Sequence, residues 1–487
     1  MAETDLERLR DRIGYAWDIA HEFGLDPFPT HFELVPATIM YEFASYSLPG
    51  RFSHWTHGKA YYRQKMLYDL GLSKIYEMVV NTNPSYAFLM EMNDLLQNTF
   101  VAAHVFGHTD FFKNNVYFQH TSRRMIERAS LNAERIARYE FDHGKLEVEH
   151  FLDAVLSIQE HVDYHLFLRG EDDEEEEEQL RRGEESRTRP STEYDDLWAL
   201  DREAKERRAE EERERRRGRP PKFPEKPQKD LLLFLIRHSP ILEPWQRDVI
   251  EIVRQEFLYF VPQMQTKVMN EGWASIWHSR IMREMADRGI ISDAETVEFA
   301  RMHASVLSPS RTSLNPYYLG YKIFEDIERR WDSPTREEQE RLGRKPGMGR
   351  QKIFEVRELD NDVSFLRNYL TKDLVEELDL YLYKKEGDEW VIVEKNWEKV
   401  RDGIVASMTN FGFPYIVVDD GDYRGNRELY LRHLHEGQDL DLVYAERTLQ
   451  YVYQLWGRPV HLETVYDGKR ILLSYDGERS SKTTLER

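Results

Sequence analysis

The chain of 487 residues contains no cysteine. Disulfides, thiolate nucleophiles, cysteine zinc sites and cysteine-ligated iron–sulfur clusters are therefore excluded. A metal ion in this protein can be held only by His, Asp, Glu or neutral oxygen ligands.

Long apolar runs are also absent. The first 30 residues are charged from the start and lack the apolar core of a signal peptide. No stretch of about 18 uninterrupted apolar residues occurs, so we predict no membrane span and expect a cytoplasmic protein.

The chain also has no excess of positive charge, since its net charge is −21. So acidic a surface repels phosphate backbones and disfavours general nucleic-acid binding. Neither a Walker A motif, nor GxGxxG, nor the GxSxG of serine esterases is present. Nucleotide hydrolysis and serine-esterase chemistry are therefore poorly supported.

Periodicity and composition divide the chain into five parts. Residues 1–168 and 230–331 show helical patterning, and residues 169–229 form a charged, disordered insert in which EDDEEEEE precedes Arg/Glu-rich sequence. Residues 332–349 read as a linker. Residues 350–487 hold three hairpin patterns, with turns near Gly387-Asp388, Gly425 and Asp467-Gly468, and helical segments near 396–410 and 440–456. We predict an α+β protein: a large, mainly helical N-terminal domain followed by a smaller α+β domain with antiparallel strands.

The first candidate site lies on a helix predicted over residues 84–113. His104 and His108 are one turn apart and face the same way. Two imidazoles at this spacing commonly present themselves to one metal ion. The alternative is that both are core histidines satisfied by hydrogen bonds. Polar residues at helical spacing extend the same face, and we expect them to bind substrate: Asn93, Gln97 and Asn115.

A second polar stripe lies in MNEGWASIWHSRIMRE, residues 269–284. Glu271, Ser275 and His278 recur at helical spacing among Trp and Ile. A carboxylate in such an apolar helix is costly unless it meets a cation or a donor. His104, His108 and Glu271 supply the ligand count of an open catalytic site for one divalent metal, with zinc favoured.

The group that would activate water is not beside the first histidine. The zincin motif HExxH has a Glu there, but Val105 occupies that position in this chain. We expect the catalytic acid or base among Glu91, His278 and His303, with His278 as a fourth ligand or a proton shuttle.

RFSHWTHGKAYYRQK, residues 51–65, is a lesser candidate. Arg51, His54 and His57 could bind an anionic part of a substrate, although a polar loop packed on its neighbours is the favoured explanation.

At these residues the sequence resembles the stage V sporulation protein R (SpoVR) family. The resembling strings include AHVFGHTDFFKNN, MNEGWASIWH and SLNPYYLGY, in order over about residues 1–330. The resemblance implies a link to spore-cortex formation or to a stationary-phase or stress-response module. It also implies a serine protein kinase and a von Willebrand A-type protein as partners.

Two hypotheses for function follow. The first is a metal-dependent hydrolase acting on an amide of peptide or cell-wall precursor material, as the two stripes suggest. The second is a non-catalytic regulatory or scaffold protein, because no base stands beside His104 and much of the sequence carries no recognisable chemistry.

Overall fold

The structure is a computed structural model that describes residues 3–69, 77–165, 222–309, 314–386, 389–485. Most of the expected insert at 169–229 lies outside the described residues. The chain separates into two compact units, residues 1–149 with 255–413 and residues 150–254 with 414–487. The α+β prediction is confirmed, because a large helical N-terminal region precedes a five-stranded sheet.

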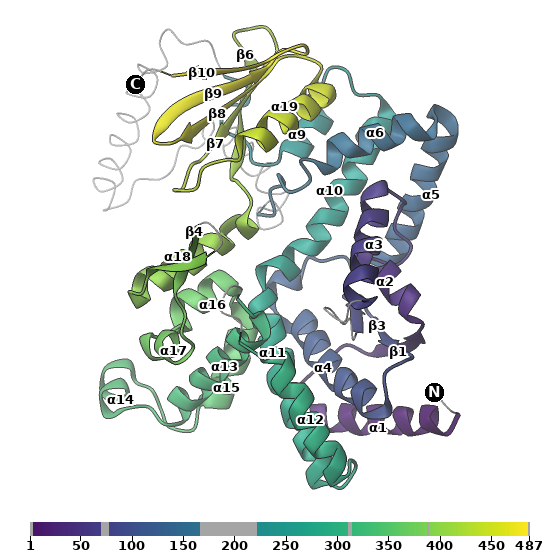
Figure 1. Cartoon of the computed structure of the whole chain (residues 1–487), viewed down its shortest axis with the longest axis vertical. Helices are drawn as coiled ribbons and strands as arrows, with labels where there is room; N and C mark the ends of the chain where they lie inside the picture. Colours follow the sequence, from purple (N-terminus) through teal and green to yellow (C-terminus); the bar gives the residue numbers. More distant parts are fainter. Residues whose placement is uncertain (1–2, 70–76, 166–221, 310–313, 387–388, 486–487) are drawn as a thin grey trace, which may run out of the picture. The chain divides into compact units, whose positions relative to one another are not determined.

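The first unit is built on a pair of central helices, α4 (Leu95–Asn114) and α11 (Lys267–Asp287), which pack side by side (Figure 1). Every residue of α4 from Asn98 to Phe112 is buried, as expected for a helix that neighbours surround. The helices packed against this pair are α1 (Glu3–Glu22), α12 (Asp293–Val306), α13 (Pro316–Asp332), α15 (Gly349–Leu359) and α16 (Asp362–Tyr369).

Two small residues set how closely these helices approach. A Cβ atom at Gly107 of α4 would lie 2.6 Å from the Cα of Ala274 in α11. A Cβ atom at Gly272 of α11 would lie 2.3 Å from the carbonyl carbon of Gly320 in α13. Glycine is therefore required at both positions, and each close contact lies beside a predicted ligand, His108 or Glu271.

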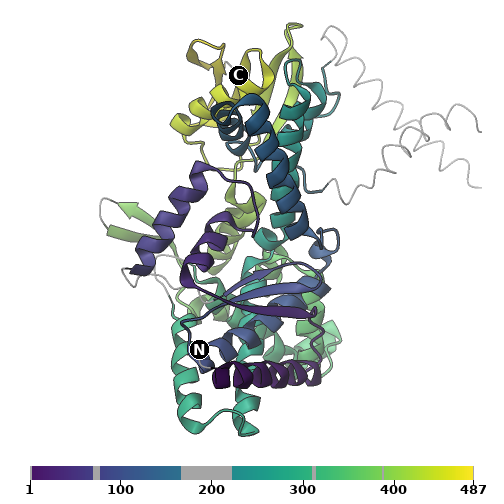
Figure 2. The same ribbon diagram turned by 90° about the vertical axis from the view of Figure 1, so that its right-hand side faces the viewer.

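A three-stranded sheet lies next to α4 (Figure 2). Its order is β1 (Thr30–Val35), β3 (Ser85–Met90), β2 (Glu77–Val80), with β1 parallel and β2 antiparallel to β3. The predicted helix over 84–113 is thus wrong at its start, because residues 85–90 are a strand. Phe88, Leu89 and Met90 are all buried, and a short apolar run of this kind looks alike in a buried strand and a buried helix. The helix begins only after Asp94, whose carboxylate caps it in a capping box with Gln97.

The remaining elements of the first unit surround these layers. They are α2 (Ala37–Tyr46), α3 (Trp55–Asp69), η1 (Val116–Phe118), α5 (Met125–His143), α14 (Arg336–Leu342), α17 (Lys372–Glu377), the hairpin β4 (Leu382–Glu386) and β5 (Glu389–Glu394), α18 (Trp397–Met408) and η2 (Thr409–Gly412). The chain divides between the two units within α6 (Lys145–Leu156) and α10 (Pro244–Gln265).

The second unit carries a five-stranded sheet in the order β10-β9-β8-β7-β6. Its hairpins β6 (Ile416–Tyr423) with β7 (Glu428–His433) and β8 (Val460–Tyr466) with β9 (Lys469–Tyr475) match two predicted hairpins, and β10 (Ser480–Thr484) extends the second. One pairing differs from the expected antiparallel arrangement: β7 and β8 are parallel. The reason is α19 (Leu442–Trp456), which connects them as a crossover and packs on β8 and β9. The unit also contains α9 (Leu231–His238).

The division between the units differs from the boundary expected at residue 350. Ile353, Phe365 and Val400 belong to the core cluster of the first unit, although all three lie beyond that boundary. The turn-rich stretch 332–349 is therefore a connection inside the first unit and not a domain linker. It holds α14, which is capped by Thr335 and Glu338.

Candidate metal centre

The central helices bring the predicted metal ligands together. The Nε2 atoms of His104 and His108 on α4 lie 3.6 and 3.5 Å from Oε2 of Glu271 on α11. A second carboxylate arrives from the sheet, because Oε1 of Glu77 at the start of β2 lies 4.0 Å from Nε2 of His104. The ligand atoms of Glu77 and the two histidines all lie within 4.8 Å of one another.

These separations suit a four-coordinate ion. Zinc–ligand bonds of about 2.0–2.2 Å in a tetrahedral site put neighbouring ligand atoms about 3.4 Å apart. The measured 3.5 and 3.6 Å agree with this value, and the Glu77 distance is slightly larger. Among the described residues, Nε2 of His104 and Oε2 of Glu271 are buried without a hydrogen-bond partner. Buried polar atoms normally find partners, so the residues present fit a bound cation.

Each histidine is held through its other ring nitrogen. Nδ1 of His108 lies 2.9 Å from Oδ1 of Asn270, which can only accept, so His108 is protonated at Nδ1. Its Nε2 lone pair is then available for a metal. A hydrogen bond of this kind fixes the tautomer and orientation of metal-binding histidines.

His104 continues into a chain of three imidazoles. Its Nδ1 lies 2.8 Å from Nδ1 of His278, and Nε2 of His278 lies 2.8 Å from Nδ1 of His303 on α12. If His104 keeps Nε2 free for a metal, its Nδ1–H donates to His278, and His278 then donates to His303. Both nitrogens of His278 are thereby used, so the structure favours His278 as a partner of His104 over its expected role as a fourth ligand.

Burial sets the protonation of these rings. Desolvation, reinforced by the neighbouring imidazole of His104, lowers the pKa of His108 to about 4. Desolvation also lowers the pKa of His278 well below its ordinary value and that of His303 to about 4. All three rings are neutral at pH 7, and neutral imidazole is the form that binds a metal.

The two carboxylates behave differently. Burial, together with the negative charge of Glu271, raises the pKa of Glu77 despite the opposing effect of His104. Burial alone would also raise the pKa of Glu271, but the adjacent His104 and His108 and the hydroxyl of Tyr317 lower it. Neighbouring groups whose pKa values are pushed apart in this way commonly divide the roles of anion and proton carrier.

A buried polar cluster fixes the two central helices relative to each other behind the site. Asp110 on α4 accepts a hydrogen bond of 2.8 Å from Nε1 of Trp273 on α11. Its other oxygen, Oδ1, accepts from the backbone N–H of Asp26, and Nε of Arg357 lies 3.5 Å from Oδ2, the oxygen that Trp273 contacts. These contacts help to keep His108 and Glu271 in register, because each lies two residues from a member of the Asp110–Trp273 pair.

The side-chain amides that were expected to bind substrate instead form hydrogen bonds within the fold. Gln97 completes the capping box of α4, and the side-chain amide of Asn93 donates to Asn98. Asn115 caps η1 and donates to the backbone oxygens of Arg357 and Asp360. These residues lie near the two ends of α4, where Gln97 and Asn115 satisfy backbone groups, and they do not form one stripe with the histidines.

Two other groups of predicted site residues lie apart from the metal centre. Glu91 lies in the exposed turn after β3, whereas the histidines are buried. Arg51 pairs with buried Glu256 at 2.6 Å, and His54 and His57 are buried beside it in an aromatic setting.

Glu77, Asn270 and Tyr317 are the residues that sequence reasoning missed. Glu77 stands at the edge of a short apolar strand, and only the position of that strand beside α4 reveals its role. Asn270 directly precedes Glu271 and could have been found from the stripe. Tyr317 donates to Glu271 from the first turn of α13.

The fold and this set of side chains describe an α+β protein with a candidate metal centre made of two histidines and two glutamates. A SpoVR like protein family model matches residues 3–413, and a SpoVR-like C-terminal domain model matches residues 414–467. The chain is also 30% identical over 499 aligned positions to "Uncharacterized protein YcgB" of Escherichia coli (strain K12), with 94% of each chain covered. The chain belongs to the SpoVR family. No solved structure matches it.

The family boundary at residues 413 and 414 coincides with the division between the two units on that side of the chain. Within the described residues, no helix is long and apolar enough to cross a membrane.

Proposed function

We propose that this protein is a metal-dependent hydrolase that cleaves an amide, with zinc bound by His104, His108 and Glu271. The observation that carries the proposal is the convergence of the two Nε2 atoms on one carboxylate oxygen at 3.5 and 3.6 Å. Two histidines and one glutamate are the protein ligands of several hydrolytic zinc sites, which leave a position for water. A bound zinc ion would polarise the substrate carbonyl and lower the pKa of water.

Glu77 is the proton carrier in this proposal and takes the role that the sequence left to Glu91. Its raised pKa suits a group that accepts a proton from water and returns it to the leaving amine. The side chains of Glu77 and Glu271 are each 19% exposed, against 5% for His104, so solvent reaches the centre from the carboxylate side. Substrate would approach from that side.

Tyr317 and the imidazole chain have supporting roles. Burial and the charges of Glu271 and Glu77 raise the pKa of Tyr317, so its hydroxyl stays protonated and orients Glu271 by donating to it. His278 and His303 fix the tautomer of His104 through hydrogen bonds of 2.8 Å. We assign both as positioning residues.

The test compares Glu77→Gln with Glu91→Gln in zinc-loaded full-length protein. We expect E77Q to keep stoichiometric zinc, measured by mass spectrometry, and to lose about 10²- to 10⁴-fold of the hydrolysis of a fluorogenic peptide-amide panel. E91Q should match the wild type in both measurements. Zinc-loaded wild type without hydrolysis of any panel member, or equal loss in E91Q, would contradict the proposed roles.

The cellular setting is proposed from the family alone. We place the activity in the cytoplasm, in spore-cortex formation or a stationary-phase or stress module, beside a serine protein kinase and a von Willebrand A-type protein. Co-purification of the tagged chain with such proteins from stationary-phase cells would test this.

A structural metal in a regulatory or scaffold protein is the second candidate. It is favoured by the low exposure of both histidines, 5% and 7% at their side chains, which suits an ion that joins two helices. This candidate predicts that removing zinc lowers the melting temperature while no amide is cleaved. The E77Q comparison separates the two candidates because only the hydrolase requires the carboxylate.

A further inference from the structure

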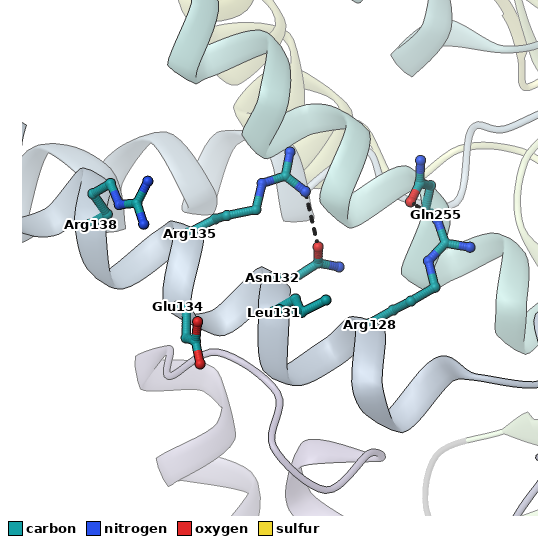
Figure 3. Close-up of a pocket in the computed structure, with 7 residues that line it drawn as sticks. All are labelled: Arg128, Leu131, Asn132, Glu134, Arg135, Arg138 and Gln255. Atoms are coloured by element: carbon teal, nitrogen blue, oxygen red, sulfur yellow. Dashed lines mark hydrogen bonds between the residues drawn. The ribbon is translucent and has the colours of Figure 1, made fainter.

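A basic pocket on the first unit stands apart from the metal centre. It is an open pocket of about 350 Å³ between α5 and the part of α10 that begins at Gln255 (Figure 3). Such a volume is at the small end of ligand-binding cavities. We call it the arginine pocket, and its lining residues are Arg128, Leu131, Asn132, Glu134, Arg135, Arg138 and Gln255.

The charge of this pocket is opposite to that of the protein. Three guanidinium groups and one carboxylate line it, which gives a net charge of +2, whereas the whole chain carries −21. Figure 3 shows the Glu134 carboxylate directed away from the guanidinium of Arg135. Three like charges on one helix face repel one another, so they lower the stability of α5 unless an anion joins them.

Neutral amides orient two of the three arginines. Arg135 donates to Oδ1 of buried Asn132 at 3.2 Å, and Arg128 donates to Oε1 of Gln255. The amide oxygen of Gln255 holds the guanidinium of Arg128 in place without cancelling its charge. Within the described residues, Arg128 has no carboxylate within ion-pair distance and Arg138 has no hydrogen-bond or ion-pair partner.

We propose that the arginine pocket binds a small phosphate monoester. A phosphate monoester carries a charge of about −1.5 to −2 at pH 7, which matches the net charge of the lining. Guanidinium groups bind phosphate oxygens with paired N–H donors, and three arginines on one face suit a group with three terminal oxygens. The arginines, Asn132 and Gln255 can also hydrogen-bond to hydroxyl groups of the rest of the ligand, as in a sugar phosphate.

The small volume of the pocket, about 350 Å³, favours a small molecule over a phosphorylated protein. The site lies between two helices and its lining extends over one face of α5. This inference is independent of the proposed hydrolase activity, since none of the metal-centre residues lines the pocket.

The experiment is calorimetric titration of the full chain at low salt with glucose 6-phosphate, inorganic phosphate, acetate and a phosphoserine peptide. We expect glucose 6-phosphate to bind most tightly. Its affinity should rise with pH through about 6, where the phosphate loses its second proton, whereas acetate should show no such rise. Tighter binding of the peptide, or no binding of either phosphate, would overturn the proposal.

Three single-residue variants complete the test. Arg135→Gln and Arg138→Gln should each weaken glucose 6-phosphate binding about tenfold or more, because each removes a charged donor pair. Arg301→Gln is the matched control, since Arg301 is an exposed arginine on α12 that pairs with Glu298. It should leave the affinity unchanged. An equal loss in all three variants would mean that overall charge, and not the pocket, attracts the anion. Arg135 and Arg138 are both exposed, so R135Q and R138Q should both fold as the wild type does.

Discussion

Two buried histidine pairs lie in the first unit, and their surroundings differ in one respect. His104 and His108 face the carboxylates of Glu271 and Glu77. His54 and His57 lie beside the ion pair of Arg51 and Glu256, whose side chains are 10% and 0% exposed. Among the described residues, the carboxylates that face His104 and His108 have no arginine paired to them. The carboxylate near His54 and His57 is already neutralised by an arginine.

The comparison shows that histidine spacing alone does not make a metal site. Near His57 the positive charge of Arg51 disfavours any further cation, and burial together with that charge lowers the pKa of His57 to about 4. Near His108 the carboxylates attract a cation, while burial keeps the ring neutral. The two sites differ in the charge of the neighbouring side chains: free carboxylates lie beside His108, whereas an arginine lies beside His57.

The largest expected difference between the pairs is in metal content. His104→Ala or His108→Ala should abolish stoichiometric zinc, because each removes one of three ligands. His54→Ala should retain it in full. Metal analysis of the three purified variants makes the measurement. Equal zinc content in H104A and wild type would contradict the proposal that His104 is a zinc ligand.

The second prediction concerns the arginine of the other pair. Arg51→Met leaves the buried carboxylate of Glu256 without its partner and should lower the free energy of unfolding by about 3–5 kcal/mol. Zinc content should not change. Urea unfolding measures the loss, and the double variant R51M/E256M should recover most of it. A loss as large in the double variant would show that packing, and not the unpaired charge, is responsible.

A smaller effect is expected at the partner of His108. Asn270→Ala removes the acceptor that orients the ring and should weaken zinc binding about 10- to 100-fold without abolishing it. Competition with a chelator gives the affinity. Asn98→Ala, a buried amide near the start of α4, is the control and should bind zinc as the wild type does.

The smallest effect is on acid stability. The pKa of His57 is depressed in the folded protein, so the unfolded chain binds its proton more readily. The neutral ring therefore contributes stability above about pH 6.5 that is lost as pH falls towards about 4. His57→Phe keeps an aromatic ring on Tyr46 and should lose less stability than wild type between those pH values. Unfolding curves at several pH values test this, and identical pH profiles would contradict it.

Local sequence patterns correctly predicted features that depend on residues close together in the sequence, such as helix faces and hairpin turns. Helical spacing put His104 and His108 on one face, and the cost of a carboxylate in an apolar helix singled out Glu271. The Asp467-Gly468 turn marked the hairpin of β8 and β9. Contacts between residues that are distant in the sequence could not be predicted from such patterns. Glu77 reaches the centre only because β2 pairs with β3 beside α4, and the parallel pairing of β7 with β8 depends on how α19 crosses over.

Helix ends account for the other errors in the site. Gln97 and Asn115 have the right angular spacing to share a face with the histidines, but they satisfy backbone groups at the two ends of α4. Periodicity gives the face of a helix and not its length, so a polar residue near a terminus is ambiguous.

The packing of α4 against α11 brings together residues that are far apart in the sequence, so it carries an entropy cost of loop closure. His108 and Asn270 hydrogen-bond although 162 positions separate them, so the contact closes a very long loop. The entropy of closing a loop grows only with the logarithm of its length, and each doubling costs about 0.6 kcal/mol more. Flexible loops within the chain between the two helices can therefore lengthen with little effect on the pairing of α4 with α11. An ion held across this seam would act as a reversible cross-link, and its contribution to folding would depend only weakly on the length of the intervening segment.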